Sequence, residues 1–154
     1  MKATAKALKT FVSGFGLPAY TTQTVPKGVE VPYLVYPLVE PEWNQKTSFY
    51  IQGWYRTTSN TALVEKADQI IKEIGTGIII NTESGYLVIY PESPLFQLMT
   101  DGDYRSFYIN LSINVYQMPG AYPVPPESTP TTQTPGDDPE TQQPGETSEE
   151  GEEQ

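Results

Sequence analysis

The amino-acid sequence predicts an α+β domain: a four- to five-stranded, mainly antiparallel sheet with two helices on one face, followed by a disordered C-terminal tail. Residues 107–116 alternate strictly between apolar and polar side chains, which is typical of a strand with one buried face. Residues 60–74 carry a single apolar stripe at helical spacing. From Pro119 onward almost every residue is Pro, Gly, Ser, Thr, Gln or acidic, a composition that cannot bury enough apolar surface to fold. We therefore expect two regions, 1–118 and 119–154.

The first expected element is a short amphipathic helix over residues 2–12, which Gly14 ends. Its three lysines share one face, and its larger apolar residues share another. This pattern is compatible with binding at a membrane surface, but only two large aliphatic residues are available over about three turns. Packing against the rest of the domain is therefore the favoured interpretation. A loop is expected over residues 17–28.

Two strands are expected next. The first spans about 29–39, where Pro32 and Pro37 cannot donate hydrogen bonds to a ladder, so it either lies at an edge or is broken there. The Pro41-Glu42-Trp43-Asn44 segment predicts a turn. The second strand spans residues 48–56, with two sets of alternating side chains.

The best helix signal covers residues 60–74, with Ser59 or Asn60 as its N-cap and Gly75 as its left-handed stop. A β-hairpin is expected to follow, with strands at 77–81 and 86–90.

The last part of the domain is expected to contain a short helical turn and a strand. Residues 93–103 predict the turn, with Leu95, Phe96, Leu98 and Met99 directed inward. The closing strand over 107–116 would bury one face in the core. Its other face carries uncharged and partly aromatic residues: Tyr108, Asn110, Ser112, Asn114 and Tyr116. Such a face suits contact with another protein, and it also suits a solvated sheet built of good strand formers. Both interpretations stay open.

The formal net charge of −10 is concentrated in the tail. The region from Pro119 to the end holds nine acidic residues and no Lys or Arg, so the preceding region carries only −1. A nearly neutral domain offers no broad basic field, which argues against sequence-specific nucleic-acid binding. The sequence has no run of 18 apolar residues and no apolar stretch after its first lysines, so we expect neither a membrane partner nor a secretory signal.

The chain contains no Cys and no His. These absences remove the usual zinc ligands and the common nucleophile–base pairs. Asp101-Gly102-Asp103 is the one tight carboxylate pair in the domain; a calcium-binding loop would need a Glu where the chain has Ser112, so a plain turn is expected. We expect no catalytic residues, no cofactor and no metal, and therefore no enzyme.

The candidate interface residues follow from exposure and residue type. Arg56 and Arg105 are the only arginines, and each is able to bind a partner carboxylate or to form an ordinary surface ion pair. The complete candidate set is Tyr55, Arg56, Arg105, Tyr108, Asn110, Asn114 and Tyr116.

Several segments resemble the tail terminator proteins of bacteriophages with long, non-contractile tails. They are Pro32-Tyr33-Leu34-Val35-Tyr36, then Gly53-Trp54-Tyr55-Arg56-Thr57-Thr58-Ser59-Asn60 running into residues 62–74, and the run 93–103 followed by 104–116. The resemblance covers roughly residues 5–118 and rests on strand, cap and turn patterns rather than on catalytic motifs.

The resemblance implies a homo-oligomeric ring, commonly a hexamer, that caps the polymerised tail tube, stops its growth and offers a surface to the head connector. The implied partners are other copies of the chain, the tail tube protein and the head-connector or stopper protein. The implied location is the tail or neck of the virion, reached by assembly in the host cytoplasm. The tail after Pro119 is not part of the resemblance.

Three alternatives remain. A head–tail connector or stopper subunit belongs to the same structural class. A monomeric module that binds a protein or a glycan through its Tyr-rich surface belongs to a second class. An enzyme that depends on carboxylates or Tyr belongs to a third, and the composition argues most strongly against it.

Overall fold

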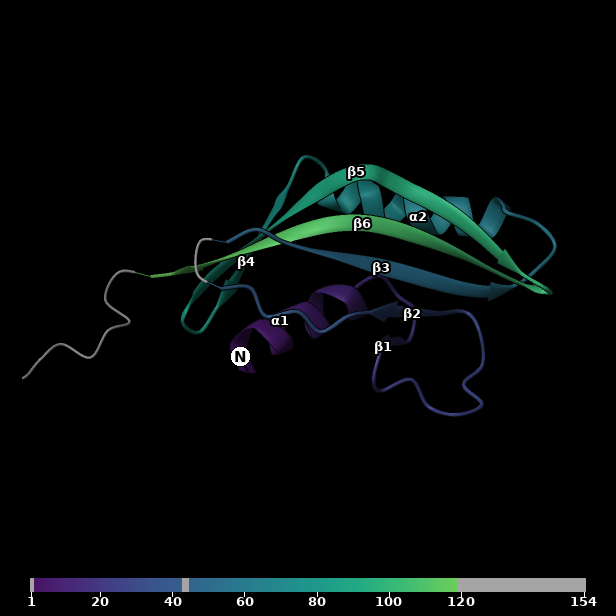
Figure 1. Ribbon diagram of the computed structural model, residues 1–154, viewed down its shortest axis with the longest axis horizontal. Helices are drawn as coiled ribbons and strands as arrows, with labels where there is room; N and C mark the ends of the chain where they lie inside the picture. Colours follow the sequence, from purple (N-terminus) through teal and green to yellow (C-terminus); the bar gives the residue numbers. More distant parts are fainter. Residues whose placement is uncertain (1, 43–44, 119–154) are drawn as a thin grey trace, which may run out of the picture. The chain divides into compact units, whose positions relative to one another are not determined.

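The computed structural model describes residues 2–42 and 45–118, which form a sheet of six strands with two helices (Figure 1). The elements in chain order are α1 (Lys2–Ser13), β1 (Ala19–Thr21), β2 (Tyr33–Tyr36), β3 (Thr47–Arg56), α2 (Thr61–Ile74), β4 (Ile78–Thr82), β5 (Gly85–Asp101) and β6 (Tyr104–Gln117). The predicted α+β class with two helices is confirmed, but the sheet has six strands instead of four or five. The predicted tail over 119–154 and the Trp43-Asn44 part of the predicted turn lie outside the described residues.

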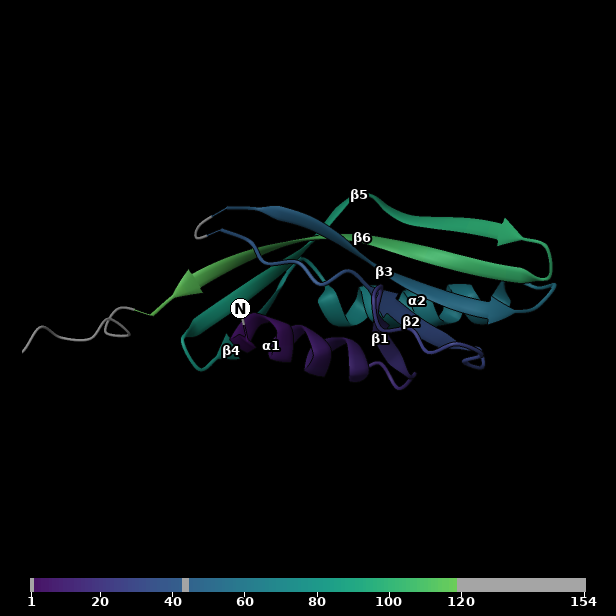
Figure 2. The same cartoon turned by 60° about the horizontal axis from the view of Figure 1, so that its bottom comes forward.

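The strands are arranged in the order β1-β2-β3-β6-β5-β4. Neighbouring strands run antiparallel, except that β1 and β2 are parallel. The longest pairings lie at the centre, where β6 pairs with β3 on one side and with β5 on the other. Figure 2 shows both helices on the same side of the curved sheet, which leaves the opposite side without a helix.

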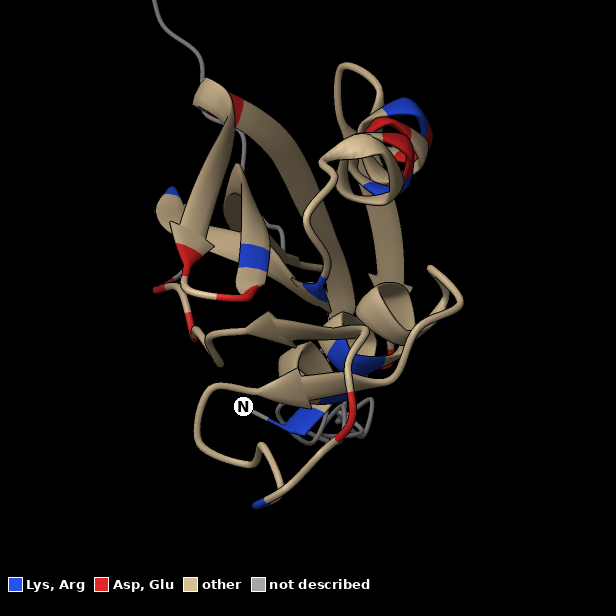
Figure 3. Ribbon diagram, turned by 90° about the vertical axis from the view of Figure 1, so that its right-hand side faces the viewer, with Lys and Arg blue, Asp and Glu red and all other residues tan. Residues whose placement is uncertain are grey.

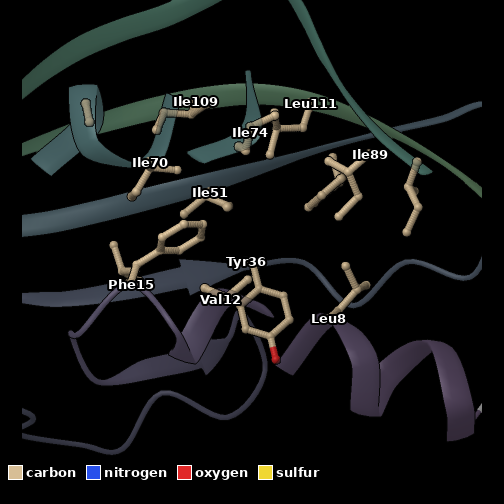
Figure 4. Close-up of a cluster of buried hydrophobic side chains, with 14 of the residues drawn as sticks. Leu8, Val12, Phe15, Tyr36, Ile51, Ile70, Ile74, Ile89, Ile109 and Leu111 are labelled. Atoms are coloured by element: carbon tan, nitrogen blue, oxygen red, sulfur yellow. The ribbon is translucent and has the colours of Figure 1, made fainter. Parts of the chain in front are cut away.

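The hydrophobic core fills the space between this side of the sheet and the helices (Figure 4). Odd-numbered residues of β6 supply its centre, and each is fully buried: Phe107, Ile109, Leu111 and Ile113. Burying a side chain of this size contributes about 1.5–3 kcal/mol. The strict alternation of the sequence therefore reports the buried face of β6 correctly.

Both predicted helices are present. Leu8 and Val12 of α1 are completely buried, which confirms that this helix packs on the domain. In α2 the stripe is buried as expected, and Gly75 ends the helix with a positive φ of 55°. Asn60 occupies the cap position without capping through its side chain, whereas the Ser59 hydroxyl accepts a hydrogen bond from the Thr61 N–H.

The predicted loop over 17–28 and the predicted strand over 29–39 need correction. The strand is only four residues long, because Pro32 and Pro37 bracket β2 and neither ring nitrogen can donate to the ladder. Part of the predicted loop is β1, which pairs in parallel with β2 and adds a strand to the sheet.

The predicted helical turn over 93–103 is wrong. β5 runs through this segment as far as Asp101, with an irregularity in register between Pro91 and Phe96. Leu95 and Phe96 pack against the core as expected, but Met99 lies on the opposite side of the sheet, and Leu98, although on the helix side, is not covered; the exposed fractions of Leu98 and Met99 are 41% and 54%. Pairing with β6 satisfies the backbone of this segment, a long-range interaction that outweighs the local clustering of apolar residues.

The two hairpin turns of β4–β5–β6 lie at opposite ends of β5. At one end Gly102, with a φ of 56°, allows the Asp101-Gly102-Asp103 turn, which confirms the predicted plain turn. At the other end the β4–β5 turn contains Ser84, whose carbonyl accepts a hydrogen bond from the Met118 N–H.

Candidate functional site

The side of the sheet without helices is called the outer face here. It consists of the even-numbered residues of β3 and β6, together with the residues that pair beside them on β1, β2, β5 and β4. Figure 3 shows strands almost without charged residues, while α2 carries many. The aromatic residues of the outer face are Tyr20, Tyr33, Tyr50, Trp54, Tyr86, Tyr90, Tyr104, Tyr108 and Tyr116.

The tyrosines of the outer face pack against one another in pairs. Tyr50 and Tyr108 form an edge-to-face pair with ring centroids 5.2 Å apart. Tyr86 and Tyr116 stack at 5.0 Å with an interplanar angle of 18°. Such pairs bury part of each ring and fix its orientation. The outer face is therefore a largely preordered aromatic surface rather than a set of freely moving side chains.

Several polar groups between the tyrosines are buried. Gln52 donates a hydrogen bond of 3.2 Å from its Nε2 to the Ser106 Oγ. Ser112 is completely buried, and its Oγ has no hydrogen-bond partner among the described residues. The Asn114 Oδ1 is likewise unpaired there, although the Nδ2 of the same residue donates to the Tyr116 hydroxyl at 3.1 Å. These groups make the centre of the outer face dense and uncharged.

A polar pocket of about 330 Å³ lies on the outer face over β3 and β6, beside the irregular segment of β5. Glu92 accepts a hydrogen bond of 2.7 Å from the Ser48 hydroxyl and forms an ion pair with Lys46. Hydrogen bonds from Lys46 and then Ser48 hold the pKa of the Glu92 carboxyl below its ordinary value. Asn110 donates to the Pro94 carbonyl at 2.5 Å. These contacts tie the irregular segment to β3 and β6.

The electrostatics of the outer face keep it neutral. Burial, with a smaller effect from Tyr50, raises the pKa of Tyr108 above its ordinary value of 10.0. Burial likewise raises the pKa of Tyr33. Both hydroxyls therefore remain protonated near neutral pH and act as hydrogen-bonding groups without charge.

Five of the seven candidate interface residues share the outer face. Tyr108, Asn110, Asn114 and Tyr116 are half-buried there, and Arg56 is exposed at its end. The Arg56 guanidinium lies 5.9 Å from the centre of the Tyr104 ring and 3.7 Å from an Asp103 carboxylate oxygen. The sequence left two roles open for Arg56, a contact with a partner carboxylate or a surface ion pair. The structure shows the surface ion pair, with Asp103.

The other two candidate residues lie on the helix side. Tyr55 packs against Phe107 with ring centroids 6.4 Å apart, and burial raises the pKa of its hydroxyl. The Nε of Arg105 donates to the Thr57 carbonyl at 3.1 Å, and its Nη1 donates to the Asn60 Oδ1 at 2.6 Å. The Arg105 guanidinium is therefore occupied by hydrogen bonds to the β3–α2 connection.

Sequence reasoning missed most of the outer face because strand order was unknown. Tyr86 and Tyr90 belong to it, yet only the pairing of β5 with β6 brings them beside Tyr116 and Ser112. The available signal was the recurrence of Tyr at alternate positions within several strands. The exposed residues Leu98 and Met99 were missed because the segment had been expected to be helical.

The residues that the structure describes hold no group of three or more acidic side chains suited to a metal ion. Among the same residues, neither helix is long and apolar enough to cross a membrane.

Comparisons with known proteins support the fold alone. No family model and no curated protein matches the chain. Solved structures do match. One of them is similar over 77% of this chain and 94% of its own length, with a TM-score of 0.54 and 14% sequence identity. At that identity the chain shares the arrangement of helices and strands with the solved structure, and nothing about activity follows.

Proposed function

We propose that this chain is a structural subunit of a phage virion, which forms a ring that caps the tail tube, ends tube growth and offers a surface to the head connector. The proposal assigns no catalytic role, cofactor or metal to the chain. Its partners are further copies of itself, the tail tube protein and the head-connector protein.

The outer face is the observation that carries the proposal. It runs across all six strands, is rich in tyrosine and is nearly free of charge. Tyrosine brings large contact area at small entropic cost, and depletion of charged residues is typical of the centre of protein interfaces. The paired rings reduce that cost further, because their rotamers are already restricted before a partner binds.

Assembly is the first experiment. Light scattering and negative-stain electron microscopy of the purified protein are expected to give closed rings, and addition of the protein to polymerising tail tube protein is expected to halt growth. A strict monomer that neither binds tubes nor stops their growth would overturn the proposal.

A matched pair of charge insertions tests the role of the outer face. Gln97 is exposed on the outer face beside Tyr108, whereas Gln23 is exposed in the connection after β1. Gln97→Glu and Gln23→Glu add the same charge with almost no change in shape. Gln97→Glu is expected to weaken assembly at least tenfold, and Gln23→Glu is expected to leave it unchanged. Equal behaviour of the two variants would show that the outer face is not a contact surface.

A connector or stopper subunit is the related alternative, and the end of the tube that the protein binds distinguishes it. Electron microscopy of a tail-tube preparation incubated with the protein shows which end it occupies.

The polar pocket favours a second candidate function, a monomeric module that binds a glycan or a peptide. Ser48, Tyr50 and Asn110 there present hydroxyl and amide groups beside an aromatic ring, a combination suited to sugar hydroxyls. This candidate predicts a monomer with a saturable ligand. Asn110→Ala, which changes a residue that lines the pocket, would then reduce ligand binding, whereas Gln97→Glu would leave it unchanged.

A further inference from the structure

Three exposed apolar side chains gather where β5 meets β6. Leu98, Met99 and Tyr104 have exposed fractions of 41%, 54% and 42%. They flank the turn at Gly102, and this end of the hairpin, residues 98–104, is called the hairpin tip. Met99 and Tyr104 lie on the outer face, and Leu98 lies on the helix side. A hairpin end with apolar groups on both sides is suited to insertion between two surfaces.

An apolar groove of about 450 Å³ lies between α1 and β4. Ala3, Ala7 and Phe11 form its helix wall, and Ile80 contributes to its strand wall. Lys6 and Glu83 join the two walls through an ion pair of 3.1 Å. β4 is an edge strand of the described sheet with β5 as its neighbour, so the groove borders an edge that no other described strand pairs with.

The hairpin tip and the α1–β4 groove lie at opposite ends of the same strand. β4 pairs with the first residues of β5, whereas the tip contains its last residues. A strand of 17 residues spans about 50 Å when straight. Figure 1 shows the same separation, with the β5–β6 turn at one end of the sheet and α1 and β4 toward the other. One copy therefore cannot fill its own groove with its own tip.

The charges at the two ends are complementary. Asp101 and Asp103 flank the tip turn. Asp103 pairs with Arg56, whereas Asp101 makes no ion pair among the described residues, so the tip keeps a net negative charge. The exposed face of α1 carries Lys2, Lys6 and Lys9, of which only Lys6 has an ion-pair partner within the same residues. An acidic turn that approaches this helix gains favourable long-range attraction.

We propose that the hairpin tip of one copy inserts into the α1–β4 groove of the next copy, with Met99 as the apolar anchor. The contact rests on the proposed ring function and identifies the two surfaces that form the joint. Because tip and groove are different surfaces, the contact is heterologous. A heterologous contact generates a closed ring when its rotation closes, and a filament when it does not.

Cysteine cross-linking tests this contact cleanly, because the chain contains no Cys of its own. Met99→Cys places one thiol on the tip, and Ala7→Cys places one on the groove wall. Ala3→Cys is a second groove variant, used if Ala7→Cys does not fold. Leu38→Cys is the control, since Leu38 is 49% exposed and belongs to neither surface. A short bismaleimide is added to each single variant and to equimolar mixtures.

The expected result is a cross-linked dimer in the mixture of Met99→Cys with Ala7→Cys, at least tenfold more abundant than in either variant alone or with Leu38→Cys. A chain that carries both cysteines is expected to give a ladder of products up to the size of the ring.

Two results would overturn the contact. Cross-linking of Met99→Cys with itself would show that two tips meet. Absence of the mixed product, in a preparation that still forms rings or caps tubes, would exclude the contact while the proposed function stands. If the protein is a monomer that also fails to bind tubes, both the contact and the proposed function fail.

Discussion

Arg105 of β6 and Asn60 at the start of α2 are joined by a hydrogen bond of 2.6 Å from Nη1 to Oδ1. The same guanidinium donates to the Thr57 carbonyl through its Nε at 3.1 Å. One side chain thus binds both the backbone of the β3–α2 connection and the residue that precedes the helix. The contact fixes the direction in which the chain leaves the sheet and enters α2.

Arg105→Ala is expected to lower the free energy of unfolding by about 1–2 kcal/mol, because it removes two charge-assisted hydrogen bonds. Arg56→Ala is the matched control. Its ion pair with Asp103 is exposed on both sides, so the expected loss is below about 1 kcal/mol. Urea unfolding measures both. Equal losses in the two variants would contradict the structural role of Arg105.

The stability of the fold is expected to respond differently when each of the two buried serines of β6 is replaced by alanine. Ser106 accepts a hydrogen bond from Gln52, so Ser106→Ala removes this buried hydrogen bond and is expected to cost about 1–3 kcal/mol. The Ser112 Oγ has no partner among the described residues, so Ser112→Ala is expected to be neutral or to stabilise the fold. Thermal unfolding of both variants decides the matter; a large loss for Ser112→Ala would mean that its hydroxyl is hydrogen-bonded in solution.

Gly53 lies directly beneath the ring of Phe107. A Cβ at this position would stand 2.3 Å from Phe107 Cε1, although Phe107 is completely buried and has little room to move. Gly53→Ala is expected to destabilise the fold by about 1–3 kcal/mol through overpacking. The double variant Gly53→Ala with Phe107→Leu is expected to recover part of this loss, and a double-mutant cycle measures the coupling. Strict additivity would argue against the close approach.

The Glu92 carboxyl makes stability depend on pH. Its pKa is lowered in the folded chain, chiefly by Lys46, so ionised Glu92 stabilises the fold above the ordinary carboxyl value of about 4.3. This contribution disappears as the pH falls through the lower folded pKa. Glu92→Gln is therefore expected to be less stable than the parent at pH 7 and equally stable at low pH. Denaturant titrations between pH 3 and 7 test this expectation.

Glu83→Gln is the control for the pH experiment. Glu83 pairs with Lys6, but their side chains are 80% and 77% exposed, so the substitution is expected to change stability little at any pH. If the difference in unfolding free energy between Glu92→Gln and the parent stays constant from pH 7 to pH 3, the electrostatic origin of the effect is refuted.

Truncation after Met118 is expected to leave the fold intact. The core cluster formed by the described residues lies entirely before this point, and the Met118 N–H still reaches the Ser84 carbonyl. Circular dichroism and thermal unfolding of residues 1–118 should match those of the full chain within about 0.5 kcal/mol. A marked loss of stability would assign a structural role to the region from Pro119 onward.

The sequence correctly predicted those helices and strands whose own residues carry a long periodic pattern. The alternation in β6 and the stripe of α2 each extend over ten or more residues, and both elements were predicted within a few residues of their observed bounds. The three residues of β1 hold no such pattern, and their pairing with β2 depends on distant parts of the chain. The end of β5 was mistaken for a helical turn because four apolar residues cluster there, whereas its pairing with β6 is visible only in three dimensions.

The sequence predicted which residues of a single strand share a face, but it did not predict which strands lie next to one another on the candidate surface. Alternation places Tyr108, Asn110, Asn114 and Tyr116 on one side of β6. It does not reveal that Tyr50 and Tyr86 contact these residues, because strand order sets those neighbours. The role of Arg105 was also hidden, since its partners lie more than forty residues away in the sequence.

The hydrogen bond between Met118 and Ser84 has a practical consequence for the design of fusion proteins of this domain. Lys6, near the first residue of α1, meets Glu83 at the same turn, so both ends of the described domain converge there. A fluorescent protein fused to either end of residues 1–118 therefore stands beside the groove, and the tip stays clear. Such a fusion would block the groove of its own copy and leave its hairpin tip free to insert into the groove of a neighbour. It would therefore end a growing assembly at that copy, and its fluorescence would report the number of contacts formed.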